Sequence, residues 1–488
     1  MNSKFFEELK EKRRILADSF DDPAATGVWN SVIDKYSEQA HFIYELIQNA
    51  DDTQATYARF KLYHDRLLFA HNGKRQFTIS NPLTEKEDRK NGCLGDVNAI
   101  LSIGHSSKTQ HNTIGKFGVG FKAVFQYTQT PYIFAPDIMF KIERFIVPVT
   151  IIEDHIERKE DETLFEFPFN HEINNADIAF DAISQRLLSL VNPTLFLSNL
   201  QEIDFEFDDT KGYYRKIIDK TYDFANTKAE LISLSQTIGE ESKERKLWLF
   251  SRNDDSSGRY SVGFYLDDNG NLMPVNEYAY CFFPTKADTG LHFIIHAPFL
   301  LTDSREGIKE GEPHNQHMLD LLSDLSADSL SYLAEIGDKN KHRLIKDGIL
   351  SIIPTESLNQ TDWRGRVTQP SKFEPFYQKI LTAFQTRRII PTKDSYTTAE
   401  DAYWAASNNI STVFNNTILR DLIHKPNASW IFPSASREKY QEYIEIILPE
   451  ESINYEEEDT VVHCIDEDVL IERITPSFIQ NRDIKWLK

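Results

Sequence analysis

Cysteine is scarce in this sequence of 488 residues. The three cysteines, Cys93, Cys281 and Cys464, are widely spaced and odd in number. This pattern fits neither a disulfide framework nor a zinc site. We therefore expect a reducing compartment and a cytoplasmic protein.

Long apolar runs are also missing. The longest stretches, such as 291–301, are interrupted by histidine and fall short of the ~20 apolar residues that cross a bilayer. The chain starts with MNSKFFEELKEKRRIL, a charged amphipathic stretch without the apolar region of a signal peptide. The sequence predicts no membrane contact.

Positive charge is in deficit. Lys and Arg total 54 against 76 Asp and Glu, which gives a net charge of -22. Such a surface repels phosphate backbones, so nucleic acid is not the expected partner. A local basic groove is still compatible with this overall charge.

The common phosphate-binding motifs are absent as well. The chain has neither the Gly-Lys-Ser/Thr of a P-loop nor the G-x-G-x-x-G of a dinucleotide site, but it has G-x-x-G-x-G at Gly115, Gly118 and Gly120. Glycines let backbone N–H groups approach an anion, and a helix starting there adds its positive dipole end. A purely structural turn is the alternative.

Two polar groupings accompany these glycines. Glu45, Asn49 and Asp52 lie four and seven residues apart, on one stripe of a helix, where a carboxylate and an amide oxygen can orient a water and hold Mg2+. A polar surface face would look the same. Ser106, Ser107 and Lys108 suit phosphate oxygens, as a closing lid or as an ordinary solvated loop.

Apolar periodicity indicates an α+β sandwich in which helices cover one sheet. Helical spacing covers residues 30–50 and ends at Asp51, Asp52 and Thr53. Further helices are expected at 96–103 and 176–191, and strands at 57–63, 66–70, 76–79, 132–134, 140–149, 163–167 and 202–207.

Three regions are expected, with boundaries at 1–208, 209–340 and 341–488. The polar stretch 208–245 is weakly periodic and marks a candidate boundary. After it, strands are expected at 247–251, 260–265 and 291–295 and a helix at 316–336, which together suggest a second α/β unit.

Three segments together carry a family resemblance. ELIQNADD, HNGKRQF and IGKFGVGF resemble, in this order, the nucleotide boxes of the GHKL ATPases, a superfamily that includes the ninety-kilodalton heat-shock chaperone. SIGHSSK and FKAVFQYT look most like its sacsin-type branch. The resemblance implies a Bergerat-fold ATP-binding domain at 1–208, a chaperone-like α/β middle domain and a smaller mixed C-terminal region.

The resemblance assigns roles residue by residue. Glu45 would be the general base that activates water, Asn49 would hold Mg2+, and Asp52 would line the ATP pocket. The remaining phosphate-side positions are Ser106, Ser107, Lys108, Gly115, Lys116, Phe117, Gly118, Val119, Gly120 and Phe121.

The second box departs from the family pattern. The family usually has Asp-x-Gly, with the aspartate reading the adenine amino group, whereas this chain has His71, Asn72 and Gly73. Asn72 is expected to accept a hydrogen bond from the base, and Gly73 to let the base approach. Thr163 resembles the family's late adenine-side threonine.

A distant arginine completes the expected site. LLTDSREGI at 300–308 resembles the chaperone loop whose arginine reaches the γ-phosphate, so the resemblance gives Arg305 that role. The alternative is a surface pair with Asp303 or Glu306.

Two functions remain after these comparisons of motif and charge. The first is an ATP-hydrolysing conformational machine that dimerises on nucleotide binding and acts on a protein client. The second is a nucleotide-gated sensor with little turnover that serves an effector, as in bacterial stress or phage-defence systems. A histidine kinase would carry a dimerising helix with its phosphoacceptor histidine ahead of the nucleotide boxes, and it is disfavoured because only 44 residues precede Glu45. The net charge disfavours DNA processing. We also expect the natural protein to continue beyond residue 488.

Overall fold

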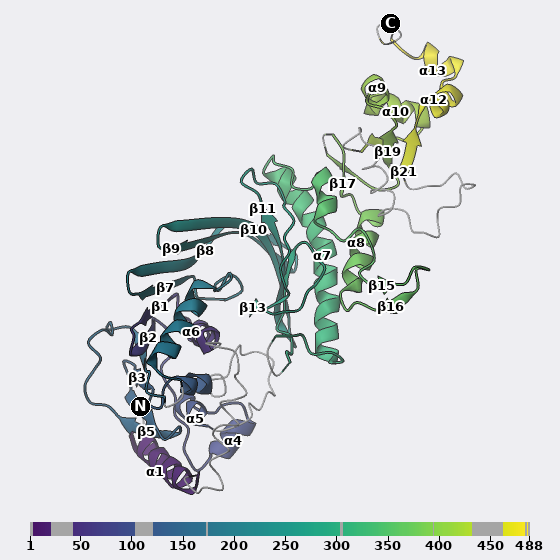
Figure 1. The fold of residues 1–488 in the computed structure, drawn as a ribbon. Coiled ribbons are helices and arrows are strands. Elements are labelled where there is room, and N and C mark those ends of the chain that lie inside the picture. The colour runs from purple at the N-terminus through teal and green to yellow at the C-terminus, as the bar shows by residue number, and fades with distance from the viewer. Residues whose placement is uncertain are drawn as a thin grey trace.

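The computed structural model describes residues 3–20, 42–102, 121–171, 174–302, 306–393, 395–431, 462–483 and 486. Its architecture is mixed α+β, with one large mixed sheet and flanking helices (Figure 1). The expected α+β class is confirmed at this level. Cys93, Cys281 and Cys464 form no disulfide bond. Among the described helices, none has the length and apolar character of a membrane-spanning segment.

The first part of the chain alternates helices with short strands. Its helices are α1 (Ser3–Phe20), α3 (Phe42–Asp52), α4 (Glu85–Lys90), α5 (Asp96–Ile100), the 3-10 helix η2 (Phe121–Gln126) and α6 (Ala176–Leu188). Its strands are β1 (Tyr57–Leu62), β2 (Arg66–His71), β3 (Tyr132–Phe134), β4 (Met139–Glu143), β5 (Val147–Thr150), β6 (Thr163–Pro168) and β7 (Glu202–Phe207).

Long strands dominate the middle of the chain. They are β8 (Thr210–Phe224), β9 (Thr227–Ile238), β10 (Glu241–Asp254) and β11 (Gly258–Leu266), followed by the short β12 (Tyr280–Cys281), β13 (Phe283–Pro284) and β14 (Ile294–His296). Then come α7 (Pro313–Lys339), η3 (Asp347–Ser351), the hairpin β15 (Gln360–Thr361) and β16 (Val367–Gln369), and α8 (Glu374–Thr386). Helix α7 packs on β10, β11 and α8.

A small α/β unit ends the described chain (Figure 1). It contains β17 (Ile390–Pro391), β18 (Tyr396–Thr397), β19 (Ala402–Ala405), α9 (Asn408–Val413), α10 (Asn416–Ile423), β20 (Ser429–Trp430), β21 (Val462–Ile465), α12 (Glu467–Arg473) and α13 (Pro476–Gln480). β19 lies between β20 and β21, and both pairings are parallel.

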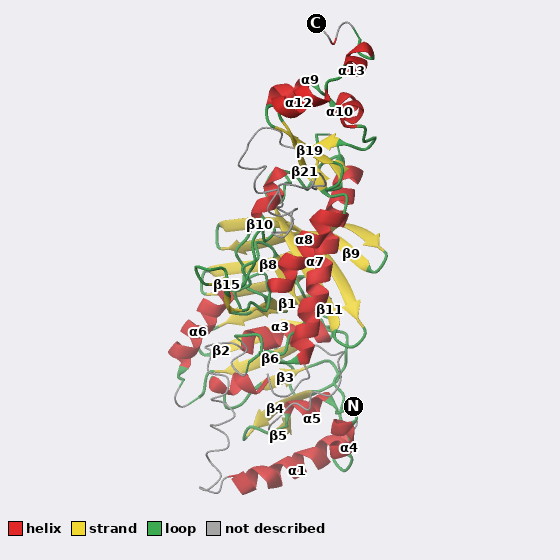
Figure 2. Ribbon diagram, turned by 90° about the vertical axis from the view of Figure 1, so that its right-hand side faces the viewer, coloured by secondary structure: helices red, strands yellow, loops and turns green. Residues whose placement is uncertain are grey.

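One sheet runs through the first two parts of the molecule. Its order is β13-β12-β14-β11-β10-β9-β8-β7-β1-β2-β6-β3-β4-β5, and Figure 2 shows these strands stacked along the molecule. β1 pairs with β7 in parallel and with β2 in antiparallel register. The site described below lies where α3 meets β2, in the first part.

Three expected elements differ from the structure. The stretch 208–245 is not a polar linker, because β8, β9 and the start of β10 fill it. Its weak periodicity arises because β8 is solvated on both faces over part of its length, with Ile217 54% and Ile218 44% exposed. The strand expected at 140–149 is the hairpin β4–β5, which turns at Arg144 and Phe145 with positive φ. Residues 76–79 form no strand, and the N–H of Thr78 donates to the Asp96 carboxylate instead.

Candidate functional site at the end of helix α3

Helix α3 carries the acid and the amide that the sequence singles out. Glu45 and Asn49 are both buried, at 7% and 6% exposure. They share the helix with Ile43, Leu46 and Ile47, whose side chains enter the first apolar core. A solvated polar face on a surface helix does not fit this burial. The alternative that these side chains form a polar surface face is therefore wrong.

The expected end of this helix is confirmed. α3 stops at Asp52, Thr53 N–H donates to the carbonyls of Asn49 and Ala50 at 3.3 and 3.1 Å, and Gln54 takes a positive φ of 64°. The chain then turns directly into β1. This turn places the last residues of α3 beside the segment that follows β2.

Gly73 lies tightly against the end of α3. A Cβ at this position would lie 1.9 Å from Oγ1 of Thr53 and 2.9 Å from Nδ1 of His71, so only glycine fits. Lys74 N–H also donates to the Thr53 carbonyl at 2.9 Å. The structure therefore brings the first and second motifs together, although the sequence separates them by some twenty residues.

Asp52 is the most perturbed acid in this corner. Burial and the neighbouring Asp51 raise its pKa from 3.8 to about 8, against the opposing charge of Arg75. Its Oδ2 atom is buried, and no donor in the described chain reaches it. Such an atom is costly without a partner, so Asp52 is suited to accept a hydrogen bond from a ligand.

Asp51 has the opposite character and was missed by the sequence reasoning. Its carboxylate accepts hydrogen bonds from the N–H groups of Ser198, Asn199 and Leu200 at 3.0, 2.6 and 2.8 Å. These bonds tie α3 to the turn before β7. The two adjacent aspartates could have indicated this difference. Successive residues are 100° apart around a helix, so the two carboxylates face different surroundings.

Arg75 is paired with the start of α5. Its guanidinium pairs with Asp96 at 2.7 Å, and Asp96 also accepts from the N–H and hydroxyl of Thr78 at 3.0 and 2.7 Å. The positive charge near Asp52 is thus held in place by the start of α5.

His71 is a buried, neutral side chain. It is 3% exposed, and burial lowers its pKa from 6.5 to about 4. Its Nδ1 accepts the N–H of Gly73 at 3.1 Å, which leaves the proton on Nε2. The remaining hydrogen-bonding atom of the ring is therefore a donor.

The side chain of Asn72 is hydrogen-bonded to the start of β1. Its Oδ1 accepts from the N–H groups of Thr56 and Tyr57 at 2.9 and 3.1 Å, and its amide donates to Oγ1 of Thr56 at 2.8 Å. These contacts fix the turn between α3 and β1. In this arrangement Asn72 positions the site, and the expected bond to a base requires it to leave these partners.

Thr163 lies beside His71 across the β2–β6 pairing and is buried. The preceding Glu162 is fully buried and accepts from Tyr57 Oη at 2.7 Å and from Nη2 of Arg59 at 2.7 Å. Although burial works against it, these bonds hold the pKa of Glu162 at about 2. The sheet therefore brings Thr163 and His71 together.

Several expected residues lie outside the described ranges. They are Ser106, Ser107, Lys108, Gly115, Lys116, Phe117, Gly118, Val119 and Gly120 in the third motif, and Arg305 with Asp303 in the later loop. Phe121 is described: it opens η2 and is buried in the same core as α3, and η2 contacts α3.

The described residues of this corner do not form a metal site by themselves. Within the described ranges, no three His, Cys, Asp or Glu side chains gather as a metal site. Mg2+ on a nucleotide needs only one or two protein oxygens, because phosphates and waters complete its shell. The buried Asp52 oxygen, which has no partner in the described chain, suits a ligand that carries a hydrogen-bond donor.

Comparison with known proteins finds two similarities. A family model described as a Sacsin domain matches residues 24–143, a span that contains all three motifs. The protein NO VEIN of Arabidopsis thaliana is 27% identical over 338 residues, which cover 60% of this chain. The same alignment covers 11% of NO VEIN, so this chain is similar to about a tenth of that relative.

Proposed function

We propose that this protein binds Mg-ATP at the end of α3 and hydrolyses it, with hydrolysis coupled to movement between its parts. The observation that carries the proposal is the meeting of α3 with Gly73, beside a buried Asp52 oxygen that lacks a partner in the described chain. The similarity of residues 24–143 to the Sacsin domain supports it independently.

In this proposal Glu45 accepts a proton from the water that attacks the γ-phosphorus, and ADP leaves from the opposite side. The Asn49 amide oxygen ligates Mg2+, which neutralises charge on the phosphates. Asp52 accepts a hydrogen bond from the base or from a water next to it, and Thr163 lies on the same side. Arg305 neutralises γ-phosphate charge when the later loop docks.

Replacement of Glu45 tests the hydrolytic step. Glu45→Ala and the isosteric Glu45→Gln should bind ATP with near-normal affinity and lose at least about 10²-fold in turnover, the lower range for a positioned general base. Calorimetric binding and steady-state phosphate release measure the two quantities. Glu240→Ala, which removes an exposed acid between β9 and β10, is the control.

Arg305→Ala should bind ATP normally but turn over about 10³-fold more slowly, as for other arginines that act on a transferred phosphate. If Glu45→Ala retains full turnover, Glu45 is not the base. If wild type binds no adenine nucleotide at all, the whole proposal is wrong.

The second candidate function is a nucleotide-gated sensor. Its support is His71, which is buried and neutral and presents a donor instead of the usual acceptor, so adenine selectivity is expected to differ from that of relatives with aspartate. Wild-type protein that binds ATP tightly without turnover, under conditions that allow dimers, would favour this function. Titration with ATP and GTP tests the base preference.

The proposal includes three kinds of partner. They are a protein client, an effector protein and a second copy of this chain that associates when nucleotide binds. A cytoplasmic location, inferred from the cysteine pattern, belongs to the proposal too.

A further inference from the structure

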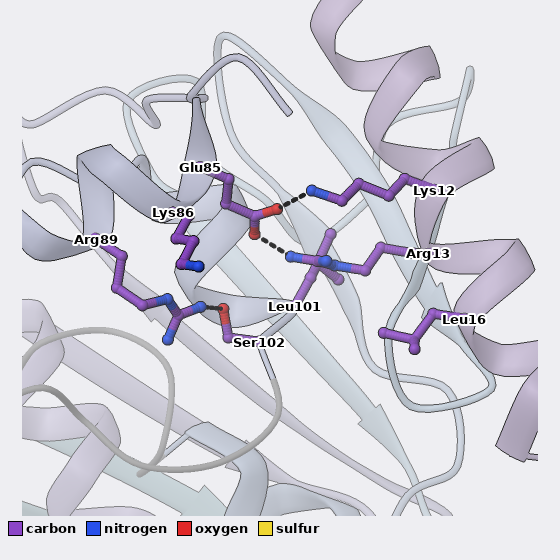
Figure 3. A pocket seen from close by; sticks show the side chains of 8 residues that line it. All are labelled: Lys12, Arg13, Leu16, Glu85, Lys86, Arg89, Leu101 and Ser102. Carbon is purple, nitrogen blue, oxygen red and sulfur yellow. Dashed lines mark hydrogen bonds and ion pairs between the residues drawn. The ribbon is translucent and has the colours of Figure 1, made fainter. Parts of the chain in front are cut away.

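A small cavity of about 270 Å³ lies between α1 and α4 (Figure 3). Side chains from two helices and from the end of α5 enclose it. Its lining residues are Lys12, Arg13, Leu16, Glu85, Lys86, Arg89, Leu101 and Ser102. None of them belongs to the proposed nucleotide set, so the cavity is a feature of its own.

The cavity is strongly basic in an otherwise acidic protein. Four of its lining residues are cations and only Glu85 is an acid, which leaves an excess of three positive charges. The whole chain carries -22. Focused charge of one sign in a concave site raises the local concentration of counter-ions.

Local geometry explains how the cations gather. Residues 12, 13 and 16 of α1 and residues 85, 86 and 89 of α4 have the same i, i+1, i+4 spacing, so each helix turns one face to the cavity. Figure 3 shows Lys12 and Arg13 of α1 reaching the two oxygens of Glu85, and Lys86 between Glu85 and Arg89. The two other acids of α4, Glu87 and Asp88, do not line the cavity.

Glu85 anchors α1 but does not satisfy the whole cluster. Lys12 reaches its Oε2 at 2.8 Å, and Arg13 pairs with its Oε1. Arg13 is 7% exposed, and its Nε is buried with no acceptor in the described chain. A buried guanidinium N–H without an acceptor costs free energy, which an anion in the cavity would recover.

The opposite side holds two further cations. Arg89 donates to Oγ of Ser102 at 2.5 Å, and Ser102 in turn donates to the Asn98 carbonyl at 2.7 Å. Arg89 is thereby held toward the cavity by the end of α5. Lys86 is exposed and forms no ion pair or hydrogen bond with another residue in the described ranges, so its ammonium is available to a ligand.

We propose that this cavity is a binding site for a small phosphate-bearing anion, separate from the nucleotide site. The volume lies just below the ~300–1,000 Å³ of drug-sized ligand pockets, which suits inorganic phosphate or pyrophosphate. Two guanidinium groups match the geometry of phosphate oxygens, and the doubly charged anion balances the excess charge better than a carboxylate does. The proposal does not depend on ATP binding at α3.

Charge reversal of Lys86 tests the proposal on the full chain. Lys86→Glu should weaken phosphate and pyrophosphate binding about tenfold, as measured by calorimetry at constant ionic strength. Lys90→Glu is the matched control, because it makes the same charge change on the same helix at an exposed residue outside the cavity and should leave binding unchanged. Arg89→Gln should also weaken binding.

The proposal is overturned by phosphate binding no stronger than chloride binding at equal ionic strength. An equal loss of binding in Lys86→Glu and Lys90→Glu overturns it as well. Repeating the phosphate titration with a saturating non-hydrolysable ATP analogue separates the two sites: retained binding supports a distinct site, whereas competition means that phosphate occupies the nucleotide site. Wild type that binds phosphate but not ATP would reject the proposed function alone.

Discussion

At the scale of single residues, the end of α3 divides two adjacent acids between support and function. Asp51 is satisfied by three backbone N–H groups and holds the helix in place. Asp52 keeps a buried oxygen without a partner in the described chain. Proteins tolerate such destabilising groups where a ligand binds to them. A substitution of Asp52 is therefore expected to change stability and ligand binding in opposite directions.

Asp52→Asn should stabilise the nucleotide-free protein. The folded pKa of about 8 lies above the ordinary 3.8, so between these pH values the folded protein keeps a proton that the unfolded chain has released. The free energy of unfolding therefore falls as pH rises from about 4 to about 8. Asparagine removes this loss, and we expect a gain of at least about 1 kcal/mol, or ~2–4 °C in Tm, at pH 8.

Thermal unfolding from pH 4 to pH 9 measures this effect. The gain should vanish near pH 4, where Asp52 is protonated in both states. Asp268→Asn, an equal charge change at an exposed turn, should show no such profile. A constant difference at every pH would contradict the raised pKa. In the proposed function the same variant binds ATP more weakly.

At the scale of elements, local pattern predicted several helices and strands that bury one face. β1, β2, β6 and β7 lie close to their expected ranges, because each has a clear apolar face, whereas residues 30–41 of the helix expected at 30–50 lie outside the described ranges. β8 and β9 were missed, and β8 is exposed on both faces over residues 217–221. The three motifs could be grouped from the sequence, but the contact of Gly73 with Thr53 depends on the fold of β1 and β2.

The loop before β6 depends on one buried acid. Both carboxylate oxygens of Glu162 accept hydrogen bonds from the Arg59 guanidinium, at 3.0 and 2.7 Å. The Tyr57 hydroxyl donates to the same carboxylate at 2.7 Å. Neither Arg59 nor Tyr57 is near Glu162 in sequence, so pattern reasoning had no signal for this cluster. It fixes the position of Thr163 and, across the pairing, of His71.

Glu162→Gln should lower the free energy of unfolding at pH 7 by about 1.5–3 kcal/mol, the range for hydrogen bonds to a charged group. The folded pKa of about 2 lies below the ordinary 4.5, so this stabilisation is present above pH 4.5 and is lost as pH falls toward 2. Denaturant unfolding at pH 7 and pH 3 tests the sign. An unchanged difference at pH 3 would mean that the glutamine acts through packing instead of charge.

At the scale of the whole molecule, the sheet continues across the boundary drawn at residue 208. β7 pairs with β8 along its full length, and β8 pairs with β9. Tyr214 on β8 belongs to the first apolar core, and its hydroxyl donates to the Leu187 carbonyl at 2.8 Å. The boundaries at 208 and 340 stay predictions, but the first part of the molecule is built with residues that follow the first of them.

This continuity carries the last prediction. Gly212 lies opposite Phe205 on β7 and Ile238 on β9, and a Cβ there would lie 2.2 Å from the Phe205 ring and 2.7 Å from the Thr237 carbonyl. Gly212→Ala should therefore displace both neighbouring strands and cost about 1–3 kcal/mol, as overpacking usually does. Gly348→Ala, where nothing lies within 4 Å, provides the matched control.

Hydrogen exchange locates the damage from Gly212→Ala. If the sheet links the two parts mechanically, amides of β1 and β7 on one side and of β9 and β10 on the other should lose protection together. Loss confined to β8 and β9 would mean that the two parts respond independently in spite of their shared sheet. In that case, nucleotide-driven movement between them would need another path, such as docking of the Arg305 loop.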